Sequence, residues 1–287
     1  MKIAISGGTG FIGKQLSDIL LRSGHEPIVI TRTDLSAGMD HLAKVIKSAD
    51  VIINLAGAPV LQRWTEKNKQ VILSSRVDTT RKLIEAVRLN LPEHKPSVFL
   101  SASAISIYKS WEIHDEQSTN WGTDFLASVC KAWEKETEPL NDLKVRLCTI
   151  RIGMVLGSAG GSLKTMLPMF RLGLGGKIGS GKQPFSFIHI DDVCRAIEFL
   201  ILNEKCTGIY NFVAPNPITN KLFTRELSKQ LHRPAIFMVP SFVLKLIFGK
   251  ASDLIIDGVT VKPAHLLKDG FQFKYPDIGS ALENILN

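Results

Sequence analysis

Cysteine is scarce in this sequence, with four residues among 287, and no two stand at a spacing typical of metal ligands. This scarcity argues against a disulfide framework and indicates reduced thiols in a cytoplasmic protein. Long apolar runs are missing as well. The opening run is soon interrupted by glycines, and the stretch 237–248 is broken by Pro240 and Lys245. We therefore expect neither a signal peptide nor a membrane span.

Blocks of like charge are also missing, although 35 Lys and Arg against 27 Asp and Glu leave a formal charge of +8. The basic residues are scattered and are not interleaved with aromatics, so a nucleic-acid partner is not expected. The positive excess suits a small ligand that carries phosphate. A hydrophobic content of 45% and a length of 287 residues allow one large α/β domain, alone or with a smaller appendage.

Strand-like runs alternate with helical patterns, which predicts parallel βαβ units and a doubly wound sheet of the α/β class. The expected strands are Lys2–Ser6, Pro27–Thr31, Val51–Leu55, Ser97–Ala102, Arg146–Arg151 and one near Gly208–Val213. Helices are expected to begin near Phe11, Met39, Lys67, Thr123 and Asp191. The span 39–50 is short for a helix and a further strand, so the sheet is expected to be abbreviated there.

The chain opens with MKIAISGGTGFIG, a strand that leads through glycines three residues apart into a helix. Gly7 permits a tight turn, Gly10 lets the backbone approach a pyrophosphate, and Gly13 allows close helix–strand packing. Free N–H groups at such a helix N-terminus bind phosphate, so we predict a dinucleotide site. A tight turn without a ligand is the alternative. The cofactor contacts expected here are Gly7, Thr9, Gly10, Phe11, Ile12 and Gly13.

The end of the second strand indicates which dinucleotide is bound. An acidic residue there accepts a hydrogen bond from a ribose hydroxyl, whereas arginine accommodates a 2′-phosphate. This strand ends in Thr31, Arg32 and Thr33, and Asp34 comes too late for the usual ribose contact. The pattern therefore favours NADP over NAD, with a solvated strand-end charge at Arg32 as the alternative.

The third expected strand ends in a run of small residues. Leu55, Ala56 and Gly57 follow Asn54, and small side chains at the carboxyl end of a strand let a planar cofactor pass close to the backbone. Taken alone, the run is typical of any strand-to-loop turn. Beside the opening glycine turn, it predicts a second contact with the cofactor.

Motifs along the whole chain resemble the extended short-chain dehydrogenase/reductase superfamily: GGTGFIG, NLAG, FLSASA and FIHIDDV. A longer set resembles its atypical "epimerase family protein" branch, which is NAD-dependent epimerase/dehydratase-like and has a small C-terminal domain. That set contains RWTEKNKQVILSSRVDTT, WEKE, RIGMVLG and MLPMFRLGLGGKIGSGKQPFSFIHIDD. The resemblance implies a Rossmann core with an NADP-type cofactor and an oxidoreductase or epimerase ancestry.

Extended members of the superfamily use a serine or threonine after one strand and a Tyr-x-x-x-Lys pair on the next helix. Ser103 matches the serine, so it is predicted to polarise a substrate oxygen, with a strand-end cap as the alternative. When the helix is anchored on Glu134, the tyrosine and lysine positions hold Leu126 and Cys130. Neither residue can perform the proton transfer of that pair. The catalytic set is therefore incomplete.

Two other residues, Tyr108 and Arg151, are candidates for roles in the site. Tyr108 follows the strand that carries Ser103, and it is predicted to be a substitute proton donor, with an aromatic lid as the alternative. Arg151 is predicted to bind the cofactor or an anionic group of the substrate. His189 and the acids after it lack the spacing of a metal site, and Asp191 is expected to cap the following helix.

These patterns predict two structural units and leave two classes of function open. Residues 1–155, completed by about 188–215, form the NADP-binding Rossmann domain, and 156–187 with 216–287 form a smaller, mostly helical substrate subdomain. The first class is a hydride-transferring oxidoreductase or sugar-nucleotide epimerase-like enzyme acting on a phosphorylated or nucleotide-linked small molecule. The second is a catalytically silent dinucleotide-binding regulatory or interaction protein. The patterns leave open whether two copies of the chain form a homodimer.

Overall fold

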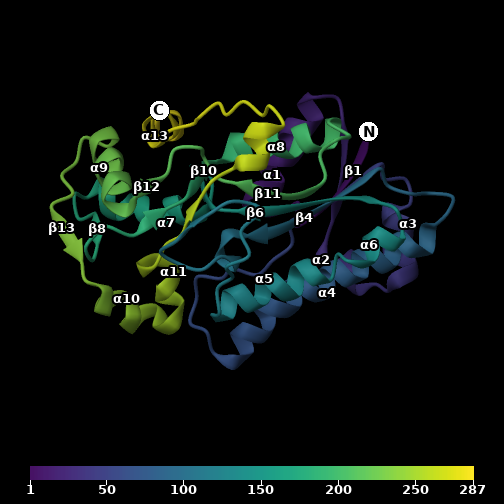
Figure 1. Cartoon of the computed structure of the whole chain (residues 1–287), viewed down its shortest axis with the longest axis horizontal. Coiled ribbons are helices and arrows are strands. Elements are labelled where there is room, and N and C mark those ends of the chain that lie inside the picture. The colour runs from purple at the N-terminus through teal and green to yellow at the C-terminus, as the bar shows by residue number, and fades with distance from the viewer.

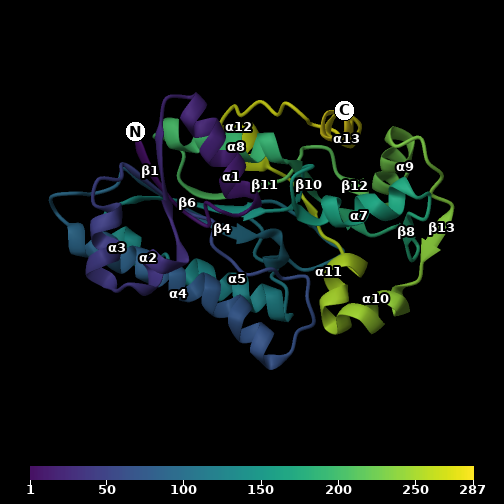
Figure 2. The ribbon, with the colours of Figure 1, turned by 180° about the vertical axis from the view of Figure 1, so that it is seen from behind.

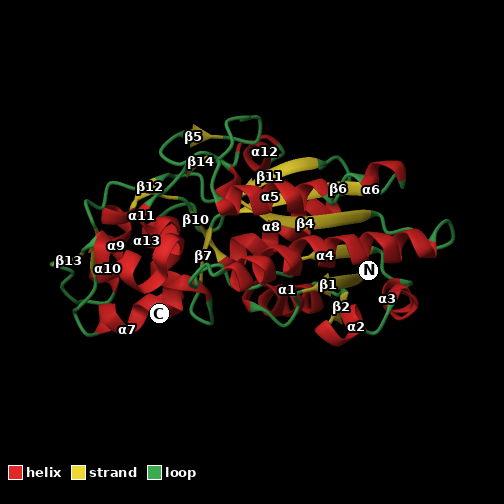
Figure 3. Ribbon diagram, turned by 90° about the horizontal axis from the view of Figure 1, so that it is seen from below, coloured by secondary structure: helices red, strands yellow, loops and turns green.

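The computed structural model describes residues 1–287 and contains one central parallel sheet of six strands (Figure 1). Its strands are β1 (Lys2–Ser6), β2 (Glu26–Ile30), β3 (Val51–Asn54), β4 (Val98–Ala104), β6 (Arg146–Ile152) and β11 (Gly208–Phe212). They lie side by side in the order β2-β1-β3-β4-β6-β11, and every neighbouring pair is parallel (Figure 3). The doubly wound α/β fold predicted from the sequence is confirmed.

The strand order reverses direction between β1 and β3. From β1 the chain runs outward to the edge strand β2, then returns to β3 on the other side of β1. At such a reversal the loops after the two central strands diverge, and ligands of open α/β sheets bind in the crevice between them. The topology therefore places the glycine turn and the loop after β3 at the same crevice.

Helices cover both faces of the sheet, as the views in Figures 1 and 2 show. One face carries α1 (Phe11–Arg22), α8 (Ile190–Leu202) and α12 (Ala264–Lys268), which share a buried apolar cluster with the strands. The other face carries α3 (Met39–Ile46), α4 (Glu66–Asn90), α5 (Phe125–Lys135) and α6 (Pro139–Asp142). None of the helices is long and apolar enough to cross a membrane.

The region between β2 and β3 has no strand of its own. The chain passes through the short helices α2 (Arg32–Ser36) and α3 and enters β3 directly, so β2 forms the edge of the sheet. The expected abbreviation is confirmed. Helix α2 was not expected from the sequence, because its five residues are too few to show helical periodicity.

A separate apolar cluster lies at the left end of Figure 1. It joins α7 (Gly161–Arg171), α9 (Asn220–Gln230) and α13 (Ile278–Leu286). The remaining elements are η1 (Ile105–Ile107), β5 (Ile113–His114), β7 (Met154–Leu156), β8 (Gly176–Ile178), β9 (Pro184–Phe185), β10 (Phe187–His189), β12 (Ile218–Thr219), β13 (Phe237–Val239), α10 (Ser241–Phe248), η2 (Gly249–Ser252), α11 (Asp253–Ile256) and β14 (Thr260–Val261). The division into a Rossmann domain and a smaller subdomain stays a prediction. Leu266 and Phe271, which the sequence analysis assigns to the smaller subdomain, pack into the apolar cluster of the large sheet.

The beginning of α8 differs from the expectation. The helix starts at Ile190, and its N-cap is His189, whose Nδ1 accepts a hydrogen bond from the backbone N–H of Asp191 at 3.0 Å. The prediction that Asp191 caps this helix is therefore wrong. The imidazole takes the role because His189 is the last residue with extended backbone before the helix.

The acid after it, Asp192, fastens the C-terminal segment to α8. Its side chain is fully buried and accepts hydrogen bonds from the backbone N–H groups of Lys274 at 2.8 Å and Tyr275 at 2.9 Å. Arg195 on the next turn of α8 pairs with the same carboxylate at 3.0 Å. A buried carboxylate that is matched on both oxygens holds two distant parts of the chain together.

We predict that Asp192→Asn lowers the free energy of unfolding by about 2–3 kcal/mol, because an amide cannot accept both backbone hydrogen bonds and leaves one N–H unpaired. Urea denaturation measures the change. The matched control is Glu198→Gln on the same helix, whose carboxylate lies 3.8 Å from His25 and is partly exposed. The control is expected to change stability by less than about 1 kcal/mol, and equal effects in the two variants would contradict the prediction.

Candidate functional site

The glycine turn after β1 has the geometry that its spacing predicts. Gly7 has a φ of 75°, in the left-handed region, and its carbonyl accepts a hydrogen bond from the N–H of Gly10 at 2.9 Å. A Cβ added at Gly13 would lie 2.3 Å from the Gly7 carbonyl oxygen. Only glycine fits at that position, because the opposing atoms belong to the backbone.

The N-terminus of α1 has no protein cap. Its N-cap is Gly10, which has no side chain to accept the first N–H groups, and no acidic residue lies in the first turn. The amides of Phe11 and Ile12 are therefore available to a ligand at the positive end of the helix. The Phe11 ring itself packs against Gly157 and Gly160, which would clash with it if they carried a Cβ. Any contact of Phe11 with a phosphate is thus made by its backbone.

The loop after β3 touches the glycine turn. A Cβ on Gly7 would lie 2.8 Å from the Leu55 carbonyl carbon and 2.9 Å from the Ala56 nitrogen. The loop is in turn held by α4, because the N–H of Ala58 donates to Ser75 Oγ at 2.9 Å. The structure thus brings together the two cofactor segments predicted from the sequence.

Arg32 lies at the open end of β2, as the first residue of α2. Thr31 is the N-cap of this helix and forms a capping box with Asp34, which also accepts a hydrogen bond from His41 at 2.9 Å. Hydrogen bonds from His41 and Thr31 lower the pKa of Asp34 to about 2. The carboxylate is therefore occupied, whereas the exposed Arg32 forms no ion pair.

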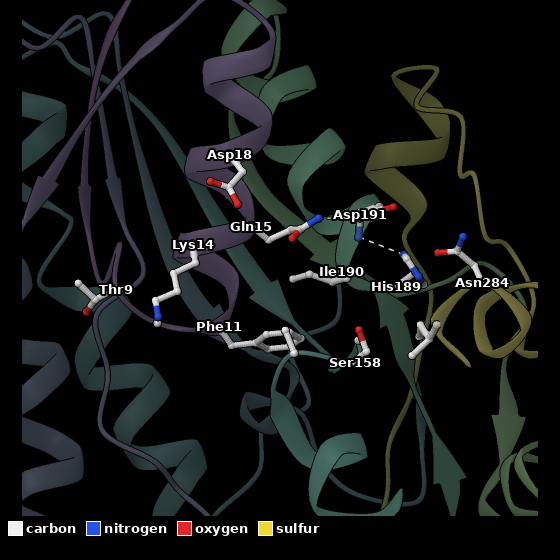
Figure 4. A pocket seen from close by; sticks show the side chains of 14 residues that line it. Thr9, Phe11, Lys14, Gln15, Asp18, Ser158, His189, Ile190, Asp191 and Asn284 are labelled. Carbon is white, nitrogen blue, oxygen red and sulfur yellow. Dashed lines mark hydrogen bonds between the residues drawn. The ribbon is translucent and has the colours of Figure 1, made fainter. Parts of the chain in front are cut away.

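A cavity of about 590 Å³ continues from the glycine turn along α1 (Figure 4). Lys14 lies toward its Thr9 end, and His189 lies beside Asn284 at the other end. Because Nδ1 of His189 accepts a backbone hydrogen bond, a neutral ring carries its proton on Nε2, which has no hydrogen-bond partner. Burial lowers the pKa of this imidazole, so the neutral form is favoured.

The helix that follows β4 carries no acid–base pair at the expected positions. Leu126 is 5% exposed and packs with Ile72 of α4, whereas Cys130 is 4% exposed and belongs to a separate apolar cluster with Ile107 and Tyr108. Burial raises the pKa of the Cys130 thiol to about 12, so it stays protonated at neutral pH. Neither residue offers a proton donor or a cation to the crevice.

Ser103 and Arg151 share one carboxylate. They are register partners on the neighbouring strands β4 and β6. Ser103 Oγ donates to Glu134 Oε1 at 2.6 Å, and Arg151 donates to both oxygens of Glu134 from Nε at 2.9 Å and Nη2 at 2.8 Å. Arg151 is 1% exposed, so it is the partner of an internal carboxylate rather than a free cation. This arrangement does not support its predicted contact with a cofactor or an anionic substrate.

Tyr108 belongs to the same network and lies in the core. Its hydroxyl donates to Asn211 Oδ1 at 2.9 Å and accepts from Arg151 Nη1 at 2.9 Å, and the residue is 1% exposed. The ring stacks between His114 and Trp121. Burial raises the pKa of this phenol. These contacts support neither the predicted proton donor nor an aromatic lid.

Residues 3–212 match the profile of the NAD dependent epimerase/dehydratase family. The chain belongs to this family. The resemblance described from the sequence motifs is thereby confirmed. Residues 239–285 match a second profile, a domain of unknown function (DUF1731).

Relatives of similar length are known in plants, bacteria and humans. The chain is 35% identical to the Arabidopsis thaliana epimerase family protein SDR39U1 homolog, chloroplastic, over 100% of this chain and 87% of that protein. Identity to YfhF of Bacillus subtilis is 34%, over 100% and 98% of the two chains. The crystal structure of human epimerase family protein SDR39U1 (isoform 2) with NADPH matches with a TM-score of 0.93 and 34% identity, over 99% of each chain.

The sequence analysis did not predict that Glu134 is the shared hydrogen-bond partner of Ser103 and Arg151. Glu134 served to anchor the helix in the comparison with the epimerase/dehydratase pattern, but its own partners were not foreseen. The partnership depends on the strand order and register of the folded sheet, in which β4 and β6 are neighbours and Ser103 lies beside Arg151. Glu134, one helical turn after Cys130 on α5, accepts hydrogen bonds from both side chains.

We predict that Glu134→Gln lowers the free energy of unfolding by about 3 kcal/mol, because it leaves the buried Arg151 guanidinium without a counter-charge. Urea or thermal denaturation measures the loss. The matched control is Glu136→Gln, since Glu136 pairs with Arg81 at the surface, where such pairs contribute about 0–1 kcal/mol. A stability loss at Glu134 no larger than at Glu136 would show that the buried pair is not an essential contact.

Proposed function

We propose that this protein binds NADP(H) in the crevice between the glycine turn and the loop after β3. The observation that carries the proposal is the start of α1: a 12-residue helix without a side-chain cap, preceded by a turn in which Gly7 and Gly13 leave no room for a Cβ. Such a helix end presents N–H donors and a positive dipole to a pyrophosphate. The human relative of known structure, described as crystallised with NADPH, supports the same ligand.

Arg32 supports NADP(H) over NAD(H). The guanidinium is exposed at the carboxyl end of β2, and the acid that could neutralise it is held by Thr31 and His41. A free, planar donor group at this position matches a 2′-phosphate, whereas no carboxylate is free to bind the ribose hydroxyls of NAD(H).

We predict that Arg32→Ala raises the Kd for NADPH about 10- to 100-fold, as expected for lost charge-assisted hydrogen bonds to a phosphate, and leaves the Kd for NADH within about twofold. Titration calorimetry measures both ligands. Arg88→Ala, which removes an exposed arginine of α4 paired with Glu85, is the control and should change neither value. Equal affinity of the unaltered protein for NADPH and NADH would reject this assignment.

Catalysis is proposed in the form of a hydride step on a carbonyl or nucleotide-linked sugar. A bound nicotinamide supplies the hydride, and Ser103, at the end of β4, is the residue proposed to hold the substrate oxygen. The hydroxyl of Ser103 already donates to Glu134, so binding an oxygen there requires an exchange of partners. A catalytically silent dinucleotide-binding protein is the second candidate. Three observations favour this second candidate: Leu126 is apolar, the Cys130 thiol stays protonated, and Tyr108 is buried in the core.

We predict that Ser103→Ala lowers kcat/KM about 100-fold if hydride transfer occurs, the size typical of losing one positioned hydrogen-bond donor. NADPH oxidation is followed with a panel of carbonyl compounds and UDP-sugars, with Ser97→Ala before β4 as the control. Tyr108→Phe in the same assay separates two roles. If Tyr108 is a proton donor, the variant loses turnover and keeps its melting temperature. If Tyr108 is only a core residue, the variant keeps turnover and its melting temperature falls. The absence of turnover with every substrate favours the silent protein.

We also propose a cytoplasmic location, which the four free and buried cysteines support. The homodimer remains a prediction from the sequence.

A further inference from the structure

A second guanidinium without a counter-charge lies at the crevice. Arg76, on α4, is half-buried between the loop after β3 and α5, and it forms no ion pair. Burial lowers the pKa of this group. Charged side chains removed from water are normally paired, because the lost hydration must be replaced. The unpaired charge therefore calls for a ligand.

The free donors of Arg76 face the cofactor loop. All its side-chain hydrogen bonds come from Nη1, which donates to the Ala58 carbonyl at 3.1 Å and to the Ile72 carbonyl at 3.0 Å. Nε and Nη2 have no such partner and lie against Gly57. A Cβ there would approach Nη2 to 2.9 Å and Nε to 3.3 Å. The glycine of this loop thus leaves room for a guanidinium whose remaining N–H groups are unused.

The other side of Arg76 faces α5, at the position of the absent lysine. The guanidinium lies 5.3 Å from the centre of the Trp133 ring. Its charge also acts on Cys130, lowering the thiol pKa against the larger, opposite effect of burial. Cys130 stands where the family resemblance places the lysine of the Tyr-x-x-x-Lys pair. Arg76 therefore brings a positive charge from α4 to the region that the lysine would occupy from α5.

The backbone at Arg76 is held in place by a buried hydroxyl. Thr80 Oγ1 donates to the Arg76 carbonyl at 2.7 Å and accepts from Asn54 Nδ2 at 2.7 Å and from Trp133 Nε1 at 2.9 Å. One hydroxyl thus joins α4 to the end of β3 and to α5. A side chain on a backbone fixed in this way loses little freedom when it binds a ligand.

We propose that Arg76 replaces the missing lysine as the residue that holds the nicotinamide half of the dinucleotide, with Nε–H and Nη2–H donating to the ribose hydroxyls on that side. The assignment rests on the proposed function, namely NADP(H) binding in this crevice. It covers only the binding role of the lysine, because a guanidinium remains protonated and no tyrosine is present at 126 to be activated.

The experiment compares two probes, NADPH and adenosine 2′,5′-bisphosphate, which lacks the nicotinamide half. In Arg76→Met the Kd for NADPH is expected to rise about 10- to 50-fold, because hydrogen bonds from a charged donor are lost. The Kd for the bisphosphate is expected to stay within about twofold, because this probe has no nicotinamide ribose. Arg76→Lys restores part of the affinity for NADPH. Arg81→Met, on the same helix with its surface partner Glu136, is the control and binds both probes as before.

Two results would overturn the assignment while leaving the proposed function intact: unchanged NADPH affinity in Arg76→Met, or an equal loss for both probes, which indicates a role at the adenine half or in the fold. Melting temperatures of the ligand-free variants are measured in parallel. If Arg76→Met does not fold, Arg76→Gln and Arg76→Lys are compared instead. For each variant the change in the Kd for NADPH is divided by the change in the Kd for adenosine 2′,5′-bisphosphate. An unaltered protein that binds neither probe rejects the proposed function, and this assignment with it.

Discussion

The whole arrangement depends on a close approach of two backbone segments. Gly7 lies so near the loop after β3 that a Cβ would overlap Leu55 and Ala56, and a Cβ at Gly13 would lie even closer to the Gly7 carbonyl oxygen. These contacts place the start of α1 directly at the point where the strand order reverses. The crevice, its uncapped amides and the exposed Arg32 all follow from that approach, because each is positioned by β1, β2 or β3.

Electrostatics divides the region beyond the crevice into two parts. Around Glu134, the charges are internally satisfied: Ser103 and Arg151 donate to its carboxylate, Arg151 also donates to Tyr108, and these three residues are withdrawn from solvent. Around Arg76 they are not, because this guanidinium has unused donors and no carboxylate partner. A satisfied network stabilises the fold, and an unsatisfied charge is available to a ligand. Arg151 and Tyr108 are therefore poor candidates for direct binding, and Ser103 can hold a substrate oxygen only if it gives up its hydrogen bond to Glu134. Arg76, in contrast, has donors that are already free.

Much of the fold could be predicted because its signals are local. The strand starting at Lys2 and the helices starting at Phe11 and Met39 have the predicted first residues. Glycine spacing likewise predicted the turn, since it reflects steric limits within a few residues. The site was less predictable: Tyr108 is in the core and His189, rather than Asp191, caps α8. The burial of Tyr108 depends on elements from distant parts of the chain that pack around it, and the cap of α8 depends on the residue at which the helix starts.

The sequence by itself determined the parallel α/β fold, the dinucleotide turn and the lack of a Tyr-x-x-x-Lys pair, since each depends on residue types at short spacing. Only the tertiary structure decided which polar groups are partners. Glu134 joins Ser103 to Arg151 across β4 and β6, and Arg76 reaches from α4 to within 5.3 Å of the centre of the Trp133 ring on α5. The reason is physical: whether a charge is neutralised or left for a ligand depends on atoms a few ångströms away, which come from distant parts of the chain.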